Sequence, residues 1–277
     1  MNHLADRRVG FVGGGAIAEA LVGGLTSAGI DRAQLTVSDV NPDRRLIMQT
    51  KLGVRAVAAN AEVVESSDVV VLAVKPDVLP GVLLELSEVK DLDLARPLWI
   101  TIAAGVPMSR VTDLLPEGAR VVRAMTNTPA LVRAAATAYY ANSRARPEDV
   151  EAARELFNAV GLTWQAPHEA LLDAVTGLSG SGPAFVFVFL EALGDAGVRC
   201  GLPREVAYKL AFQTVYGAAK LALETGRHPA ELKDQVTSPA GTTISGLERL
   251  EAGGFRSVVY STVVGATERA RELGAGE

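Results

Sequence analysis

The sequence of 277 residues is poor in the residue types that carry several common chemistries. It contains one cysteine, Cys200, and three histidines. A single cysteine excludes a disulfide framework within the chain. We interpret Cys200, in GVRCGLPRE, as a packed thiol and not a nucleophile, because no histidine lies near it in the sequence. No metal site is predicted.

Strong positive charge and long apolar runs are also missing. The net charge is −5 and no basic cluster has interleaved aromatic residues, so nucleic acid is not an expected partner. No uninterrupted apolar run reaches the roughly 18 residues that span a bilayer, and no membrane partner is expected. The first residues, MNHLADRRVGFVGGG, lead directly into a strand pattern, and no signal peptide is predicted. These features predict a cytoplasmic protein.

Short β-branched runs alternate with helical patterns as far as about residue 166. The runs VVVLAV and LWITIAA are apolar on both faces, which is typical of strands in a parallel sheet covered by helices on each side. Asn41, Pro42 and Gly53 mark the start and the end of one intervening helix. The pattern predicts an α/β fold with a doubly wound parallel sheet.

The first turn from strand to helix reads GGGAIAEAL, in which Gly13, Gly15 and Ala18 fit the pattern G-x-G-x-x-A. The first glycine permits a tight turn, the second lets the backbone approach a pyrophosphate, and the alanine keeps the helix close to the sheet. The helix N-terminus adds free N–H groups and a positive dipole. The turn therefore predicts a dinucleotide site, with a plain structural glycine turn as the alternative.

The residues after the second strand leave the choice of dinucleotide open. Asp39 stands where a carboxylate commonly binds a ribose 2′-hydroxyl, which favours NAD. Arg44 and Arg45 follow closely, and an arginine there can hold a 2′-phosphate. Alternatively, Asn41 only caps a helix and both arginines lie on its solvated face.

Two further segments are expected to border the cofactor, because ligands of such sheets lie outside the carboxyl ends of the strands. One is AVKP, from Ala73 to Pro76, where Lys75 is either catalytic or an ordinary surface lysine. The other is IAAGVP, where Ala103 and Ala104 have little side chain to obstruct a ring.

Strand signals stop at about Pro167, and helical patterns follow to the end of the chain. FVFVF alternates like a strand, but Ser181 and Pro183 mark a helix start, so we predict a helix from Pro183 to Val198. This helix is apolar nearly all round and should be buried on every side. It needs more cover than one small domain provides, which predicts an oligomer whose subunits bury it jointly. The expected domains are 1–166, binding a dinucleotide, and 167–277, helical.

The stretch SPAGTTISGLERL raises two interpretations. Thr242 or Thr243 could simply cap the helix that follows. However, hydroxyl side chains gather at Ser238, Thr242 and Thr243, more than one cap requires, and a helix N-terminus offers N–H groups to a carboxylate. The second interpretation predicts an uncharged cradle for a small acid.

Several blocks of the sequence together resemble the pyrroline-5-carboxylate reductase family. They occur in the family's order over nearly the whole chain: FVGGGAIAEAL, AVKP, IAAGV, TNTPALV, DAVTGLSGSGPAFVF, GLPREVAYKLA, HPAELKDQVTSPAGTTI and GGFRSVVY. The resemblance implies a Rossmann domain followed by a helical dimerisation domain. It further implies reduction of (S)-1-pyrroline-5-carboxylate to L-proline, the last step of proline biosynthesis.

The resemblance also implies partners and site residues. NADPH is the commoner cofactor of the family and NADH the alternative, and homodimers can assemble further, for example into decamers. The implied cofactor residues are Gly13, Gly14, Gly15, Ala16, Ile17, Ser38, Asp39, Asn60, Ala73, Val74, Lys75, Pro76, Ile102, Ala103 and Ala104. The implied substrate residues are Glu169, Ser238, Gly241, Thr242 and Thr243.

No acid–base pair stands out in the sequence, and a protonated imine accepts hydride without a strong side-chain acid. Our hypothesis is that Thr243 hydrogen-bonds the ring nitrogen and acts as the catalytic residue, while Ser238 and the N–H groups of Gly241 and Thr242 hold the carboxylate. Two rival functions are a β-hydroxyacid dehydrogenase and a nicotinamide-binding sensor without turnover. The first is disfavoured because GLSGSGPAFVF lacks the interdomain lysine that those dehydrogenases share.

Overall fold

The computed structural model describes residues 3–275 and divides into two compact units. The first runs to Ser181 and takes up the chain again from Val264, and the second comprises Gly182–Val263. The division between the units thus falls after Ser181, and the last part of the final helix groups with the sheet. The expected functional division at residue 166 stays a prediction.

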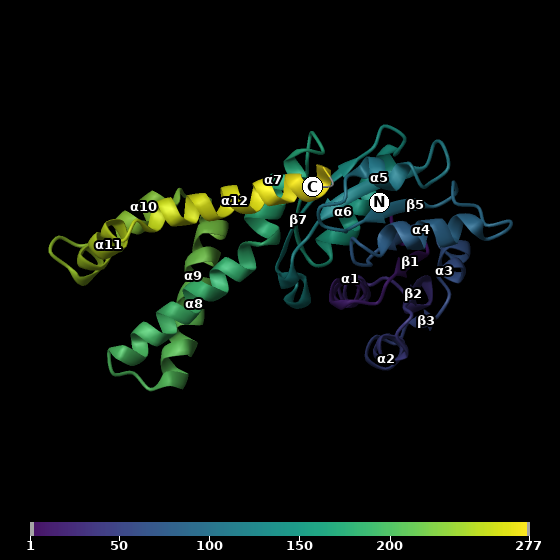
Figure 1. Ribbon diagram of the computed structural model, residues 1–277. Helices are drawn as coiled ribbons and strands as arrows, with labels where there is room; N and C mark the ends of the chain where they lie inside the picture. The colour runs from purple at the N-terminus through teal and green to yellow at the C-terminus, as the bar shows by residue number, and fades with distance from the viewer. Residues whose placement is uncertain (1–2, 276–277) are drawn as a thin grey trace. The chain divides into compact units, whose positions relative to one another are not determined.

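The first unit is built on one eight-stranded sheet in the order β3-β2-β1-β4-β5-β6-β7-β8 (Figure 1). Neighbours from β3 to β6 are parallel, as predicted. The strand order reverses around β1, which lies between β2 and β4. The strands are β1 (Val9–Val12), β2 (Leu35–Ser38), β3 (Arg55–Val57), β4 (Val69–Leu72), β5 (Leu98–Thr101), β6 (Arg120–Met125), β7 (Ala135–Ala141) and β8 (Gly161–Gln165).

The last two strands run opposite to the other six, which the sequence did not predict. Only the short helical turn η3 (Thr128–Val132) joins β6 to β7, and this connection is too short for a crossover, so β7 pairs antiparallel with β6. A full helix, α6 (Pro147–Asn158), connects β7 to β8, and these two strands are parallel.

Helices cover both faces of the sheet and create two separate cores. One core packs Val9 and Phe11 of β1 with α1 and α6, and Ala18 is fully buried in it. The other packs Val12 and Leu72 with the helices after β3, β4 and β5. The doubly wound prediction is confirmed. The remaining helices of this unit are α1 (Ala16–Ser27), α2 (Pro42–Ile47), α3 (Asn60–Ser66), α4 (Leu79–Glu88), α5 (Met108–Thr112) and α7 (Leu171–Val175).

Local start and stop signals operate as the sequence indicates. The Asn41 side chain accepts a hydrogen bond from the N–H of Asp43 and caps α2. A π-helical turn, η2 (Met48–Leu52), extends that helix to Gly53, which ends it in the left-handed conformation. A second π-helical turn, η4 (Thr176–Gly180), follows α7. A short 3₁₀ turn, η1 (Arg32–Gln34), precedes β2.

The second unit is helical throughout its regular structure. FVFVF lies in a helix, as predicted. Pro203 and Gly226 flank the next helix, where the sequence places its start and end. The helices are α8 (Gly182–Arg199), α9 (Arg204–Thr225), α10 (Pro229–Gln235), α11 (Thr242–Ala252) and α12 (Phe255–Ala275), the last extending into the first unit.

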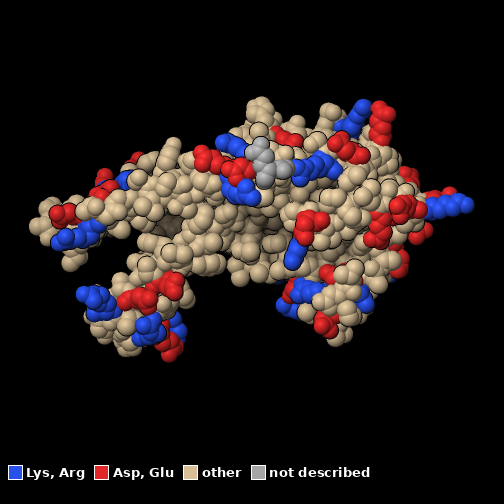
Figure 2. Space-filling view, in the orientation of Figure 1, with Lys and Arg blue, Asp and Glu red and all other residues tan. Residues whose placement is uncertain are grey.

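The helical unit exposes apolar side chains of α8, as expected of a helix that the subunits of an oligomer bury jointly. In α8, Phe187 is 63% and Val188 is 67% exposed, so this helix is not covered on every side within one chain. Figure 2 shows charged side chains gathered near the turn between α8 and α9 and around α10 and α11, with uncharged surface between them. The helical stretch Leu171–Arg199 is long and apolar enough to cross a membrane by length and composition alone, which the sequence reading did not anticipate.

Candidate active site

The glycine turn after β1 has the conformation that the sequence pattern requires. Gly13 has φ +100°, and a Cβ atom there would lie 2.7 Å from the carbonyl oxygen of Ala73, so only glycine fits. Its N–H donates to the carbonyl oxygen of Ser38 at 2.9 Å. The turn is therefore fixed between the ends of β2 and β4.

The N-terminus of α1 is open to a ligand. Gly15 is the N-cap residue, and no side chain in the described part of the chain caps the helix. A Cβ atom at Gly15 would meet nothing within 4 Å. The N–H groups that begin α1, at Ala16 and Ile17, precede the first helical hydrogen bonds. This arrangement fits the pyrophosphate of a dinucleotide.

Ser38, Asp39 and Asn60 carry polar side chains beside this turn. The carboxylate of Asp39 accepts hydrogen bonds from the N–H of Gly14 and the N–H of Asn41, each at 2.8 Å. The buried Ser38 hydroxyl donates to Oδ1 of Asn60 at 2.8 Å. All three side chains thus organise the edge where a nucleotide would lie.

The two segments after β4 and β5 meet the same edge of the sheet. The N–H of Ala73 donates to the carbonyl oxygen of Val12 at 2.8 Å, and that of Ile102 donates to Leu72 at 3.3 Å. Lys75 is exposed and lies with Val74 and Pro76 before α4, while Ala103 is buried and Ala104 exposed. The structure brings the predicted cofactor residues together, and their contact with a cofactor remains a prediction.

An ion-pair cluster borders the glycine turn. Glu19 of α1 accepts hydrogen bonds from Lys51 at 2.7 Å and from Arg44 at 2.8 Å. These bonds, from Lys51 first and then Arg44, hold the pKa of Glu19 below its ordinary value of 4.5. The Nε of Arg44 also donates to the carbonyl oxygen of Gly14 at 2.6 Å. The alternative in which both arginines lie on the solvated face of the helix is therefore wrong for Arg44.

Glu169, a predicted substrate residue, is engaged within the first unit. Its Oε1 accepts from the N–H of Met108, at the start of α5, and from Nη1 of Arg123, each at 2.7 Å. Asp173 lies 3.5 Å from the same guanidinium. These partners give Glu169 a structural role beside α5, and its proposed role toward substrate stays untested.

Sequence reasoning missed Arg123. Its side chain is only 7% exposed in β6, between Glu169 and Asp173. The signal was present, because an arginine inside the strand RVVRAM needs a buried acidic partner.

The hydroxyl-rich loop lies in the second unit, between α10 and α11. Gly241 is the N-cap residue of α11 and no side chain in the described residues caps it, while Thr242 and Thr243 lie inside the helix. The alternative that one of these threonines caps the helix is therefore wrong. Ser238 and Thr242 are exposed and Thr243 is half-buried.

One detail of the predicted anion cradle needs correction. The N–H of Gly241 donates to the carbonyl oxygen of Ser238 at 3.1 Å and closes the turn, so it is not free for a ligand. The turn also requires Ala240 at φ +55°, an uncommon conformation for alanine. The N–H groups of Thr242 and Thr243, in the first turn of α11, remain in position for a carboxylate.

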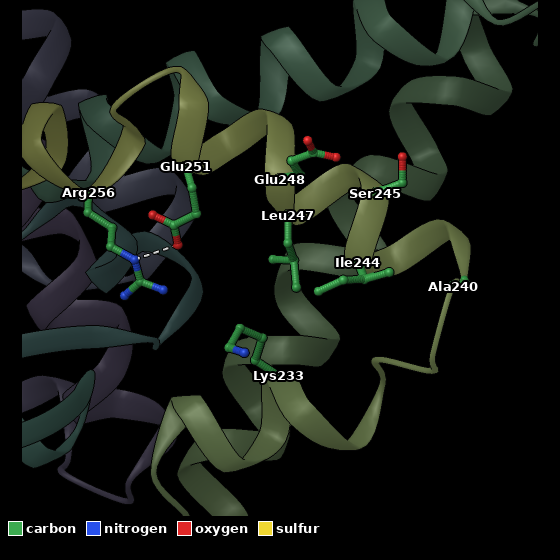
Figure 3. A pocket seen from close by; sticks show the side chains of 9 residues that line it. Lys233, Ala240, Ile244, Ser245, Leu247, Glu248, Glu251 and Arg256 are labelled. Carbon is green, nitrogen blue, oxygen red and sulfur yellow. Dashed lines mark hydrogen bonds and ion pairs between the residues drawn. The ribbon is translucent and has the colours of Figure 1, made fainter.

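A cavity of about 540 Å³ lies against α11 (Figure 3). It is lined by Lys233 of α10 and by Ile244, Leu247 and Glu251, which share one face of α11. Gly241 borders it, but the hydroxyl residues Ser238, Thr242 and Thr243 do not line it. Glu251 pairs with Arg256 at 2.7 Å.

Cys200 follows α8 and is exposed. The prediction of a packed thiol is wrong for the single chain, because the turn between α8 and α9 lies at the surface of its unit. No group of three or more His, Cys, Asp or Glu side chains within residues 3–275 is arranged to hold a metal ion.

Comparison with known proteins covers both units. Residues 169–273 match the family profile described as pyrroline-5-carboxylate reductase dimerisation, and residues 8–105 match one described as NADP oxidoreductase, coenzyme F420-dependent. The pyrroline-5-carboxylate reductase of Methanosarcina acetivorans is 49% identical over 272 residues, covering 98% of this chain and 99% of that protein.

Solved structures agree with the sequence comparison. The pyrroline-5-carboxylate reductase from Coxiella burnetii has a TM-score of 0.90 at 37% identity, covering 96% of this chain and 98% of that one. The Plasmodium falciparum pyrroline carboxylate reductase with NADP bound has a TM-score of 0.86 at 30% identity, covering 98% and 99%. The chain belongs to the pyrroline-5-carboxylate reductase family.

Proposed function

We propose that the protein reduces (S)-1-pyrroline-5-carboxylate to L-proline with NADPH, the last step of proline biosynthesis. The single observation that carries this function is the match to reductases of this name over nearly the full length of both chains. The open N-terminus of α1 beside the glycine turn supports it from the geometry of this chain.

The cofactor-binding residues fit a nicotinamide dinucleotide. The N–H groups at the start of α1 would hold its pyrophosphate, and Gly15 leaves the space that a side chain would fill. Segments 73–76 and 102–104 would border the nicotinamide, because both follow strands that end at this edge. NADPH supplies a hydride when bound, and the P. falciparum relative with NADP bound supports its use, with NADH as an alternative.

The substrate residues are part of the proposal. A hydride and a proton convert the C=N bond into the C–N bond of proline, and a protonated imine brings that proton with it. The Thr243 hydroxyl would bond the ring nitrogen, and Ser238 with the N–H groups of Thr242 and Thr243 would hold the carboxylate. Glu169 would act near the substrate only through the groups it already binds, Arg123 and α5.

The assembled state is proposed to be a homodimer. Support comes from the dimerisation profile over 169–273 and from the exposed apolar side chains of α8, which a second copy would cover. Larger assemblies of dimers, such as a decamer, and a cytoplasmic location are proposed from the family resemblance and the composition.

The direct test follows nicotinamide absorbance with the purified chain, using NADPH and then NADH. We expect oxidation of the cofactor only when pyrroline-5-carboxylate is added, with one proline formed per cofactor oxidised. Cofactor binding without turnover would favour the sensor function, and turnover only with a β-hydroxy acid and the oxidised cofactor would favour the rival dehydrogenase.

A further inference from the structure

Four basic side chains lie between the end of β2 and the end of α3, the segment that follows Ser38. They are Arg44, Arg45, Lys51 and Arg55. Three of them have acidic partners: Arg44 and Lys51 pair with Glu19, and Arg55 pairs with Glu62 at 2.8 Å. Arg45 is the fourth, and its contacts differ from those of the other three.

Arg45 makes no ion pair with any residue from 3 to 275. Its Nη1 donates to the carbonyl oxygens of Asp39 at 2.7 Å and Val40 at 3.0 Å. These acceptors are uncharged and belong to the turn that follows β2. They hold the half-buried guanidinium against this turn and leave its positive charge without a partner.

Arg44 is held in place by other contacts. It binds the carbonyl oxygen of Gly14 through Nε and the carboxylate of Glu19 through Nη2, so its guanidinium bridges the glycine turn and α1. Lys51 shares the same carboxylate. Arg44 and Lys51 thus share the charge of Glu19, and Arg44 already has hydrogen bonds to both Gly14 and Glu19.

Asp39 adds a negative charge at the same turn. Both of its oxygens accept backbone N–H bonds, from Gly14 and Asn41, so the carboxylate is fixed beside the glycine turn. A carboxylate there opposes an added phosphate, and a cation without a partner is needed to offset it.

Given the proposed function, we infer that Arg45, and not Arg44, is the residue that selects the 2′-phosphate of NADPH. Its guanidinium is bound to the turn after β2, the place where folds of this kind bind the adenosine ribose. It carries a positive charge without an acidic partner in residues 3–275 and has further N–H donors for a phosphate. Asp39 serves the 2′-hydroxyl of the alternative cofactor NADH at the same position.

The test uses equilibrium binding, which does not depend on turnover. Calorimetry would measure the affinity of the full chain for adenosine 2′,5′-bisphosphate and for adenosine 5′-monophosphate, which lacks the second phosphate. We expect the wild type to prefer the bisphosphate. Arg45→Gln should weaken bisphosphate binding about 10- to 100-fold and change monophosphate binding less than about 3-fold.

Two matched variants make the result specific. Arg44→Gln removes the neighbouring arginine and should change the affinities for both ligands by the same factor, leaving their ratio unchanged. Arg45→Lys keeps the charge and should restore part of the preference. Unchanged monophosphate binding also shows that the Arg45→Gln variant is folded.

Three results would overturn the inference: no preference for the bisphosphate in the wild type, an unchanged ratio in Arg45→Gln, or a reduced ratio in Arg44→Gln. Each leaves the proposed function standing if the same protein still reduces pyrroline-5-carboxylate with NADH. Loss of that reduction with both cofactors in the wild type would instead contradict the proposed function.

Discussion

The sheet unit buries its large apolar side chains within one chain, whereas the helical unit leaves most of them exposed. Two cores of large apolar side chains fill the sheet unit, and its strands β1, β2, β4 and β5 are buried along their full length. Between 182 and 263, the only buried hydrophobic residues within the described chain are Ala207 and Ala211. Seventeen of the thirty large hydrophobic residues that are exposed in the described chain lie in this same segment.

The difference shows which unit is complete within one chain. An apolar side chain contributes to stability only when it leaves water, and the helical unit removes few of its side chains from water. The apolar groove of about 580 Å³ lined by Phe185, Val188 and Phe189 of α8 and by Phe255 and Val259 of α12 is the clearest case. The helical unit therefore requires a second copy of the chain to cover it.

A charge placed in the apolar groove should disrupt assembly through the helical unit, whereas a charge on the surface of the sheet unit should not. Val188→Asp would bury an unpaired carboxylate in the assembled protein, which costs several kcal/mol. We expect the mass to fall to the 29.0 kDa of one chain and activity to fall with it, because the proposed substrate residues 238–243 belong to the unit that loses its cover. Light scattering and the reductase assay measure both. Leu84→Asp, at an exposed position of α4 in the sheet unit, should leave both unchanged.

Removing one hydroxyl from the helical unit should affect chemistry and not assembly. Thr243→Ala is expected to lower kcat about 10²-fold, because the bond to the ring nitrogen strengthens in the transition state. Steady-state kinetics would measure the loss, and cofactor affinity should not change. Thr225→Ala is the control, since that hydroxyl bonds only nearby backbone groups, donating to the carbonyl of Leu221 and accepting from the N–H of Arg227. Full turnover in Thr243→Ala would remove this residue from the mechanism.

Substitutions at two glycines of the sheet unit should affect its stability and its ligand binding separately. Gly13→Ala places a side chain at φ +100° and against the carbonyl of Ala73, and should lower the free energy of unfolding by about 1 to 3 kcal/mol. Gly15→Ala meets no protein atom and should keep stability while weakening NADP binding about 10-fold, as its methyl group enters the ligand space. Urea unfolding and calorimetry distinguish the two, and equal stability losses would contradict the assignment.

The smallest expected effect concerns Glu19. Because its pKa is lowered on folding, its ion pairs stabilise the protein above the unfolded pKa near 4.5, and this contribution disappears as the pH falls through the lower folded pKa. Glu19→Gln should cost about 0.5 kcal/mol at pH 7, since Lys51 is largely exposed and solvent screens the pair.

Urea unfolding at pH 7 and pH 3, at one protein concentration, measures the difference for Glu19→Gln. Glu88→Gln, at a position without an ion pair among residues 3–275, is the control. A deficit that persists undiminished at pH 3 would show that packing, and not charge, gives Glu19 its effect.

Much of the fold follows from local signals in the sequence. Asn41, Gly53 and Gly226 act at helix ends as predicted, and the strand and helix pattern gives the parallel part of the sheet. The reversal of β7 was missed because the connection through η3 gives no periodic signal of its own. The exposure of α8 within one chain agrees with the prediction that subunits of an oligomer bury this helix jointly.

The candidate site could be predicted where a backbone conformation demands one residue type. Gly13 is such a position, and the turn around it is as expected. The acidic partners of Arg123 and Arg44, which are Glu169 and Glu19, could not be identified from the sequence, because they lie 46 and 25 residues away. The hydrogen bond from the N–H of Gly241 to the carbonyl of Ser238 was missed for another reason, because the local turn that forms it includes Ala240 at an uncommon positive φ.

The molar mass of the wild-type chain in dilute solution is the measurement that tests the comparison most directly. We expect at least twice the 29.0 kDa of one chain, in an even multiple, because a second copy must cover α8. A folded, active protein with the mass of a single chain would contradict this account.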